Sequence, residues 1–223
     1  MKDRLQNVND LLLVCTEILE GNEKEVRDLR FIFNKIKTLN NLASQLMDIK
    51  KYYVGESERE DGLLSKPAYQ RLCEYVENLK KEANRELSSY VFVIHGHSAD
   101  ISELESTLKL MDKNPIFIKD LDNNNTSFIE KIENYSCVKY AVALLTPDDW
   151  GATKESNQLV LRGRARQNVI FELGYFFGKI GRDKTICLVK DGVEIPSDLD
   201  GCSNLKYKEN MNEILVELKK YLS

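Results

Sequence analysis

The second part of this sequence predicts a parallel, doubly wound α/β sheet, and the first part predicts an all-α helical domain. From residue 90 onward, short β-branched and aromatic runs alternate with segments of helical periodicity, the order typical of parallel α/β folds. Before residue 89 only helical patterns occur. We therefore expect two domains, residues 1–88 and residues 89–223.

Three helical patterns make up the first domain. Residues 1–20 place apolar side chains three or four positions apart, as an amphipathic helix does. Residues 23–54 have heptad-like spacing, and the charged run 55–62 is typical of a solvated loop. A third helix begins after Ser65, a plausible N-cap, with Pro67 in its first turn. The long apolar stripe can pack within the monomer or against another chain, and the sequence leaves both open.

Strands and helices then alternate through the second domain. Strands are expected at 90–94, 115–118, 138–146 and 184–189, with a short extended piece near 203–207. Residues 120–126 are expected to form a polar loop, and residues 147–163 a long loop. Two capping boxes, Asp100 with Glu103 and Ser127 with Glu130, predict the starts of two helices. Further helices are expected at 164–180 and 212–222.

The composition of the chain argues against several classes of function. The chain has 223 residues and a formal net charge of −4, so no basic surface field favours nucleic acid or an anionic membrane. Its five cysteines contain no CxxC pair, and there are only two histidines, which argues against a disulfide framework and a metal site. No apolar run is long enough for a signal peptide or membrane span, so we expect a cytoplasmic protein.

Glu172 is the most informative single residue. The segment around it, residues 164–180, is apolar nearly all round and so reads as a buried helix. A buried carboxylate costs several kcal/mol to desolvate unless it is paired, protonated or facing a cleft. Asn168 and Arg164 lie one and two turns earlier, which predicts a polar stripe with Glu172. Two interpretations remain: a structural glutamate paired with arginine, or a site carboxylate with an unusual pKa.

Chain order favours the second interpretation. In parallel sheets, ligands bind beyond the carboxyl ends of the strands. The loops expected there begin with His95, Gly96 and His97 after the first strand, and include Asn125 and Thr126 after the second. We take these five residues, together with Arg164 and Asn168, as candidate binding residues around Glu172. For each, a structural role, such as a tight turn at Gly96 or an exposed loop at Asn125, is the competing explanation.

The chemistry open to a single carboxylate is restricted. The sequence contains no GxGxxG or Walker motif, and we find no assignable Ser-His-Asp or Cys-His arrangement. Cleavage of NAD+ requires none of these arrangements. Its nicotinamide is a cationic pyridinium, so it leaves as a neutral molecule and needs no general acid. One carboxylate in a water-poor cleft can stabilise the oxocarbenium-like ribose.

Five motifs occur in an order that resembles a known family. They are YVFVIHGH at 90–97, TSFIEKIE at 126–133, AVALLTPDD at 141–149, RGRARQNVIFELGYF at 162–176 and IPSD at 195–198. Together they are similar to the bacterial TIR-like domain, labelled a predicted nucleotide-binding domain, of effectors in cyclic-nucleotide-triggered antiphage defence. The resemblance covers about residues 89–223.

This resemblance implies a flavodoxin-like TIR fold and NAD+ glycohydrolase activity, with NAD+ as substrate and no cofactor. It implies that Glu172 is the catalytic glutamate and that loop 120–126 is mobile. It further implies activation by self-assembly of the TIR domain. We expect the N-terminal helices to take part in this assembly, with an activating ligand or phage component as a further partner. The alternatives are a non-enzymatic scaffold or nucleotide-binding module, and a TIR cyclase that makes a cyclic ADP-ribose signal.

Overall fold

A computed structural model describes residues 1–22, 27–28, 63–121, 126–152, 160–199 and 201–223. It divides the chain into two compact units, Met1–Leu87 and Ser88–Ser223. The division falls where the sequence pattern changes from helical segments to alternating strands and helices. Each unit is described separately below.

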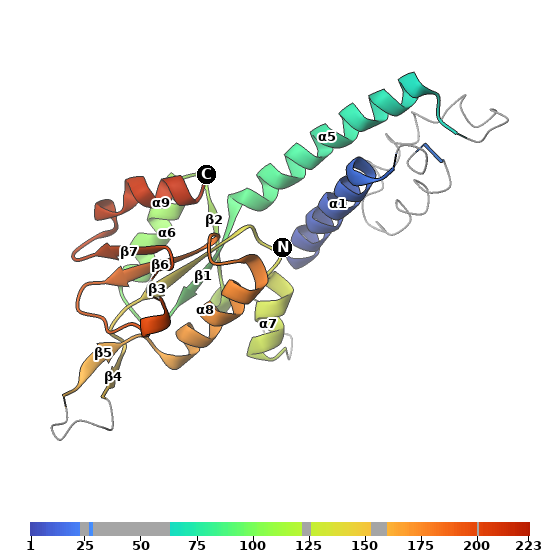
Figure 1. Ribbon diagram of the computed structural model, residues 1–223. Coiled ribbons are helices and arrows are strands. Elements are labelled where there is room, and N and C mark those ends of the chain that lie inside the picture. Colours follow the sequence, from blue (N-terminus) through green and yellow to red (C-terminus); the bar gives the residue numbers. More distant parts are fainter. Residues whose placement is uncertain (23–26, 29–62, 122–125, 153–159, 200) are drawn as a thin grey trace. The chain divides into compact units, whose positions relative to one another are not determined.

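The described part of the first unit contains two of the three predicted helices. The helix α1 spans Lys2–Glu20, and α5 spans Lys66–Ser89, running just past the unit boundary (Figure 1). The Ser65 hydroxyl accepts a hydrogen bond from the backbone N–H of Ala68 at 3.3 Å, as expected of the predicted N-cap. Each helix buries one apolar stripe, namely Leu5, Val8, Leu11, Val14, Cys15 and Ile18 in α1 and Ala68, Leu72, Val76, Leu79, Ala83 and Leu87 in α5.

The predicted heptad helix at 23–54 and the charged run at 55–62 lie outside the described residues, apart from residues 27 and 28. There, Asp28 pairs with Leu63 in an isolated antiparallel bridge, and Arg27 accepts the Leu64 N–H at 2.9 Å. Arg27 lies in a turn and Asp28 in a β-bridge, so the helical prediction is wrong for both.

The second unit is a five-stranded parallel sheet, which confirms the predicted α/β class. Its strand order is β2-β1-β3-β6-β7. The strands span Tyr90–His95 (β1), Asn114–Phe117 (β2), Tyr140–Leu145 (β3), Thr185–Lys190 (β6) and Asn204–Tyr207 (β7). All four pairings are parallel. The central β3 is buried along its whole length, in keeping with its continuous apolar sequence.

Helices cover both faces of this sheet. They span Asp100–Leu110 (α6), Phe128–Tyr135 (α7), Gln167–Ile180 (α8) and Leu215–Tyr221 (α9). Figure 1 shows α6 and α9 on one face and α7 and α8 on the other. The alternation of side chains along each strand divides the core accordingly. Val91 and Val93 belong to the cluster that includes α6 and α9, whereas Phe92 stacks on Phe176 of α8, with ring centroids 4.5 Å apart.

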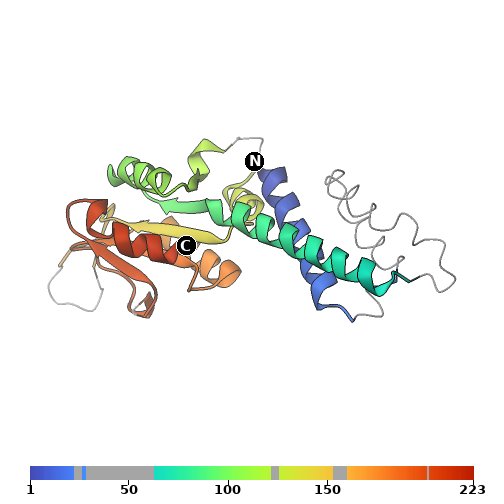
Figure 2. The ribbon, with the colours of Figure 1, turned by 90° about the horizontal axis from the view of Figure 1, so that it is seen from above.

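The long loop predicted at 147–163 contains a hairpin instead. Strands β4 (Asp149–Gly151) and β5 (Arg162–Arg164) pair in antiparallel fashion. In Figure 1 and Figure 2 the hairpin lies at the end of the second unit, beyond the parallel strands. Strands of three residues are too short to give a periodic signal. Because Arg164 belongs to β5, the following helix begins at Gln167, three residues later than predicted.

The two predicted capping boxes have different outcomes. The box at the start of α7 is confirmed: the Ser127 hydroxyl accepts the Glu130 N–H at 3.2 Å, and Glu130 accepts the Ser127 N–H at 2.6 Å. The box predicted for α6 is wrong, because Ala99 is the N-cap and caps through no side chain. The two acids of the predicted box have other partners.

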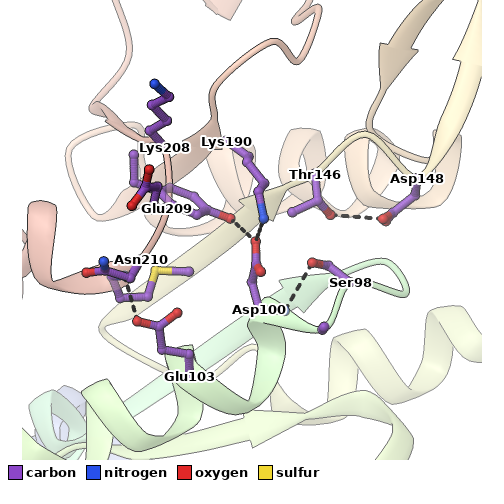
Figure 3. A network of polar contacts seen from close by, with 12 residues as sticks. Ser98, Asp100, Glu103, Thr146, Asp148, Lys190, Lys208, Glu209 and Asn210 are labelled. Carbon is purple, nitrogen blue, oxygen red and sulfur yellow. Dashed lines mark hydrogen bonds and ion pairs between the residues drawn. The ribbon is translucent and has the colours of Figure 1, made fainter.

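Those partners connect α6 to the neighbouring strands (Figure 3). The Asp100 carboxylate accepts hydrogen bonds from Lys190 Nζ and the Tyr207 hydroxyl, each at 2.7 Å. Glu103 accepts the backbone N–H of Met211 at 2.8 Å. Sequence periodicity contains no information on such contacts, since they join residues about 90 to 110 positions apart.

Candidate functional site

Glu172 lies in the second turn of α8, near the N-terminal end of this helix. Its side chain is 5% exposed. It belongs to the buried face of α8 together with Val169, Leu173 and Phe176. The opposite face is open to solvent, where Phe171 is 56% exposed, so the prediction of a helix buried all round is wrong.

The Glu172 carboxyl group has no hydrogen bond or ion pair with any residue that the structure describes. Burial raises its pKa to about 7, and no neighbouring charge contributes to the shift. A carboxyl group in this state is divided about equally between its neutral and charged forms at pH 7. The structure therefore does not support the interpretation of Glu172 as half of an arginine ion pair.

Arg164 does not form the predicted stripe with Glu172. Arg164 precedes the helix, and its Nε donates to Glu194 Oε2 at 2.5 Å. Arg162 adds a longer contact of 3.6 Å to the same carboxylate. Asn168 is on α8 but is exposed. The prediction failed for Arg164 because helical spacing was extended back through the N-cap Arg166 to the last residue of strand β5.

The flank of α8 that carries Glu172 faces α7 and β1. Phe176, four residues further along α8, contacts Phe92 of β1, and the Tyr175 hydroxyl lies 3.3 Å from Ser136 Oγ at the end of α7. Thr126, one of the predicted site residues, is half-buried and directly precedes the N-cap of α7. Asn125 lies outside the described residues.

The turn after β1 contains the other three predicted residues. His95 ends the strand and is half-buried, with its ring edge against Phe117 at a centroid distance of 5.5 Å. Its Nδ1 is 2.9 Å from the Gly96 carbonyl oxygen. Burial lowers the pKa of His95, so its ring is neutral at pH 7. His97 is exposed.

Asp148 is a contact of this turn that sequence reasoning did not single out. Its Oδ2 accepts the backbone N–H of His97 at 3.1 Å, and its Oδ1 accepts the buried Thr146 hydroxyl at 3.0 Å. A Cβ atom at Gly96 would lie 1.7 Å from Asp148 Oδ2 and 3.4 Å from Arg166 Cδ. Gly96 thus permits close packing of the turn against Asp148. The available signal was an acid just after the central strand.

A cavity of about 990 Å³ lies on the other flank of α8. Its lining consists of Asp148 to Gly151, Arg164, Ala165, Gln167, Ile170 and Glu194 to Ser197. At 100° per residue, Ile170 and Glu172 point about 160° apart around the helix. Glu172 does not line this cavity, and we treat the two as separate features.

Among the described residues no group of three or more His, Cys, Asp or Glu side chains could hold a metal ion. Within the same residues, no helix has the length and hydropathy needed to cross a membrane.

Comparison with known proteins identifies the family of this chain. The model of the TIR domain of CAP12/Pycsar effector proteins matches residues 90–209. The uncharacterized protein YuaY of Escherichia coli K12 is 35% identical over 186 residues, which is 80% of this chain and 58% of that protein. Protein tirC of Dictyostelium discoideum is 33% identical over 138 residues, 57% of this chain and 69% of that protein.

A named effector is also similar over a shorter stretch. The Pycsar effector protein PaPycTIR of Pseudomonas aeruginosa is 38% identical over 76 residues, which is 33% of this chain and 23% of that protein. The chain thus spans less than two thirds of the length of both YuaY and PaPycTIR. The family model covers the parallel sheet, α6 to α8 and the turn at His95, over more than half of the chain. The chain therefore belongs to the CAP12/Pycsar effector TIR domain family.

Proposed function

We propose that this chain is an NAD+ glycohydrolase that acts as an effector in bacterial antiphage defence. The observation that carries the proposal is the buried carboxyl group of Glu172, in the helix after the central strand, which has no partner among the described residues. A carboxyl group in this state is costly in a purely structural helix, and it is typical of functional sites. Membership of a family of effector TIR domains supports the same conclusion.

The reaction breaks the bond between ribose C1′ and the nicotinamide nitrogen. The bonding electron pair goes to the pyridinium ring, so nicotinamide leaves as a neutral molecule. Positive charge then develops on the ribose ring, and the Glu172 carboxylate stabilises it in a dry environment, where such stabilisation is strong. Water adds to C1′, a proton is released, and ADP-ribose is the second product.

Further residues are proposed to bind the substrate around Glu172. His95, Gly96 and His97 form the turn after β1, and Thr126 lies on the loop that precedes α7. Asn125 and Asn168 remain in the proposal as polar contacts for ribose or phosphate. Arg164 is left out, because its guanidinium is held by Glu194.

Nicotinamide release from NAD+ tests the proposal, with the full chain assayed over a wide range of protein concentrations. We expect release by the wild type and a 100-fold or greater loss in Glu172→Gln, the size of effect seen when one electrostatic stabiliser is removed. Glu217→Gln, an exposed glutamate of α9, is the matched control and should retain full activity. No release at any concentration would favour the alternative of a binding scaffold.

Product analysis separates hydrolysis from cyclisation. Hydrolysis yields linear ADP-ribose and consumes water, whereas a cyclase yields a cyclic ADP-ribose of lower mass. We propose hydrolysis. Mass spectrometry of the reaction mixture would contradict this if the cyclic product dominated.

We further propose that activity requires self-assembly, through the second unit and the N-terminal helices, in response to an activating ligand or phage component. The relatives named as effector proteins support a triggered activity. A protein that is fully active as a monomer would exclude this mode of control.

A further inference from the structure

We propose that Asp148 is a positioning residue that fixes the orientation and tautomer of His95. For its effect on turnover, this inference rests on the proposed function, in which the turn after β1 binds NAD+. Its structural part concerns His95 alone and stands independently of the activity.

A single peptide unit connects the two side chains. The carbonyl group of Gly96 and the N–H of His97 belong to the same planar trans peptide and so point in opposite directions. The N–H donates to Asp148 Oδ2 at 3.1 Å. The carbonyl oxygen lies 2.9 Å from His95 Nδ1. The peptide plane is therefore held on one side by the carboxylate and on the other by the imidazole.

This arrangement selects one imidazole tautomer. A carbonyl oxygen only accepts hydrogen bonds, so the Nδ1 atom facing it must carry the proton. Burial keeps the ring neutral, which leaves Nε2 unprotonated. Nε2 is then a hydrogen-bond acceptor at the carboxyl end of β1, suited to a ribose hydroxyl group. Free histidine prefers the opposite tautomer, so the protein has to impose this one.

Asp148 is itself rigidly held. Its Oδ1 accepts the hydroxyl of Thr146, a residue that is 1% exposed, and its backbone N–H donates to the Thr146 carbonyl at 2.8 Å. Figure 3 shows the Thr146 and Asp148 side chains joined in this way. A Cβ atom at position 96 would overlap Asp148 Oδ2, so a larger residue there would displace this carboxylate. The Asp148 carboxylate therefore links the turn after β1 to Thr146 at the end of the buried strand β3 and holds the turn in place.

Imidazole nitrogen shifts in protein labelled with ¹⁵N-histidine test the structural part. The chain has only two histidines, so a His97→Gln sample assigns the His95 signals. At pH 7.5 we expect the Nδ1–H form of His95 to predominate in the wild type and the Nε2–H form in Asp148→Ala. Asp149→Asn removes a neighbouring exposed carboxylate and should leave the Nδ1–H form in place. A wild type in the Nε2–H form, or an unchanged tautomer in Asp148→Ala, would overturn the inference.

Kinetics test the consequence. We expect Asp148→Ala to lower kcat/KM for NAD+ by about 10- to 100-fold, as loss of a positioning contact does, with Asp149→Asn near wild type. In a double-mutant cycle, Asp148→Ala should add little to His95→Gln, because both act through one ring. Full additivity would contradict the inference.

Two further measurements separate the possible failures. If Asp148→Ala does not fold, Thr146→Val, which removes only one contact of the carboxylate, should give a mixture of the two tautomers, and an unchanged tautomer would count against the inference. If the wild type cleaves no NAD+, the proposed function fails, and the nitrogen shifts alone decide the role of Asp148.

Discussion

At the residue scale, the state of Glu172 makes stability depend on pH. Its pKa is raised by burial from 4.5 to about 7, so the folded protein binds more protons than the unfolded chain between those values. The free energy of unfolding therefore falls as pH rises from about 4.5 to 7 and is constant above. A buried charge without a partner is the physical cause of the loss.

Glu172→Gln should accordingly stabilise the protein at alkaline pH. We expect the free energy of unfolding to increase at pH 8 by up to about 3 kcal/mol, and to change little at pH 4.5. Urea unfolding at the two pH values measures this difference. A variant less stable than the wild type at pH 8 would show that the carboxylate has a stabilising partner.

Catalysis should have the opposite dependence. The proposed reaction needs the carboxylate form, so kcat/KM for NAD+ should rise as pH increases towards about 7 and level off above it. Below that value each pH unit should lower kcat/KM about tenfold. A rate that declines between pH 6 and 8 would indicate that Glu172 works in its protonated form.

At this scale, sequence reasoning drew attention to a residue whose charge differs from that of its neighbours. Glu172 was detectable because it stands among apolar residues. The ion pair between Arg164 and Glu194 was not, because its partners are 30 positions apart and join a hairpin to a loop. Asp148 belongs to one of the five motifs, but its contact with His97 could not be predicted because the two residues are 51 positions apart.

At the scale of elements, the capping box of α7 tests how this helix is positioned. Ser127→Ala removes the hydroxyl that accepts the Glu130 N–H, and we expect it to destabilise the protein by about 1 kcal/mol. Ser106→Ala is the matched control within a helix, where the hydroxyl only donates to a carbonyl one turn earlier. Chemical denaturation at constant pH compares the two. Equal effects would mean that the cap is not formed in solution.

The elements were predictable to different degrees. All five parallel strands were expected, β7 only as a short extended piece; β1, β3 and β6 were the clearest, because they are continuous apolar runs with clear ends. The β4–β5 hairpin was missed, since its strands have three residues each and no periodicity. The α6 cap was mispredicted because the motif of Asp100 and Glu103 matches a capping box, whereas tertiary contacts take both carboxylates.

At the scale of the whole molecule, the second unit has a core of its own. A buried cluster extends from Val91 to Leu222 and contains no residue of the first unit. We therefore expect residues 88–223 to fold alone and unfold in one cooperative transition. Calorimetry of residues 88–223 alone would show whether this segment unfolds in one cooperative transition. A segment without a cooperative transition would mean that the first unit is required for folding.

The central claim is that one buried carboxylate converts NAD+ to nicotinamide and ADP-ribose. Its most direct test is the rate of nicotinamide release at pH 8 and saturating NAD+, compared between the wild type and Glu172→Gln at equal concentration. Since Glu172→Gln is expected to be at least as stable as the wild type at this pH, lost activity cannot be attributed to unfolding. We predict a rate at least 100-fold lower in Glu172→Gln. Equal rates in the two proteins would contradict the claim.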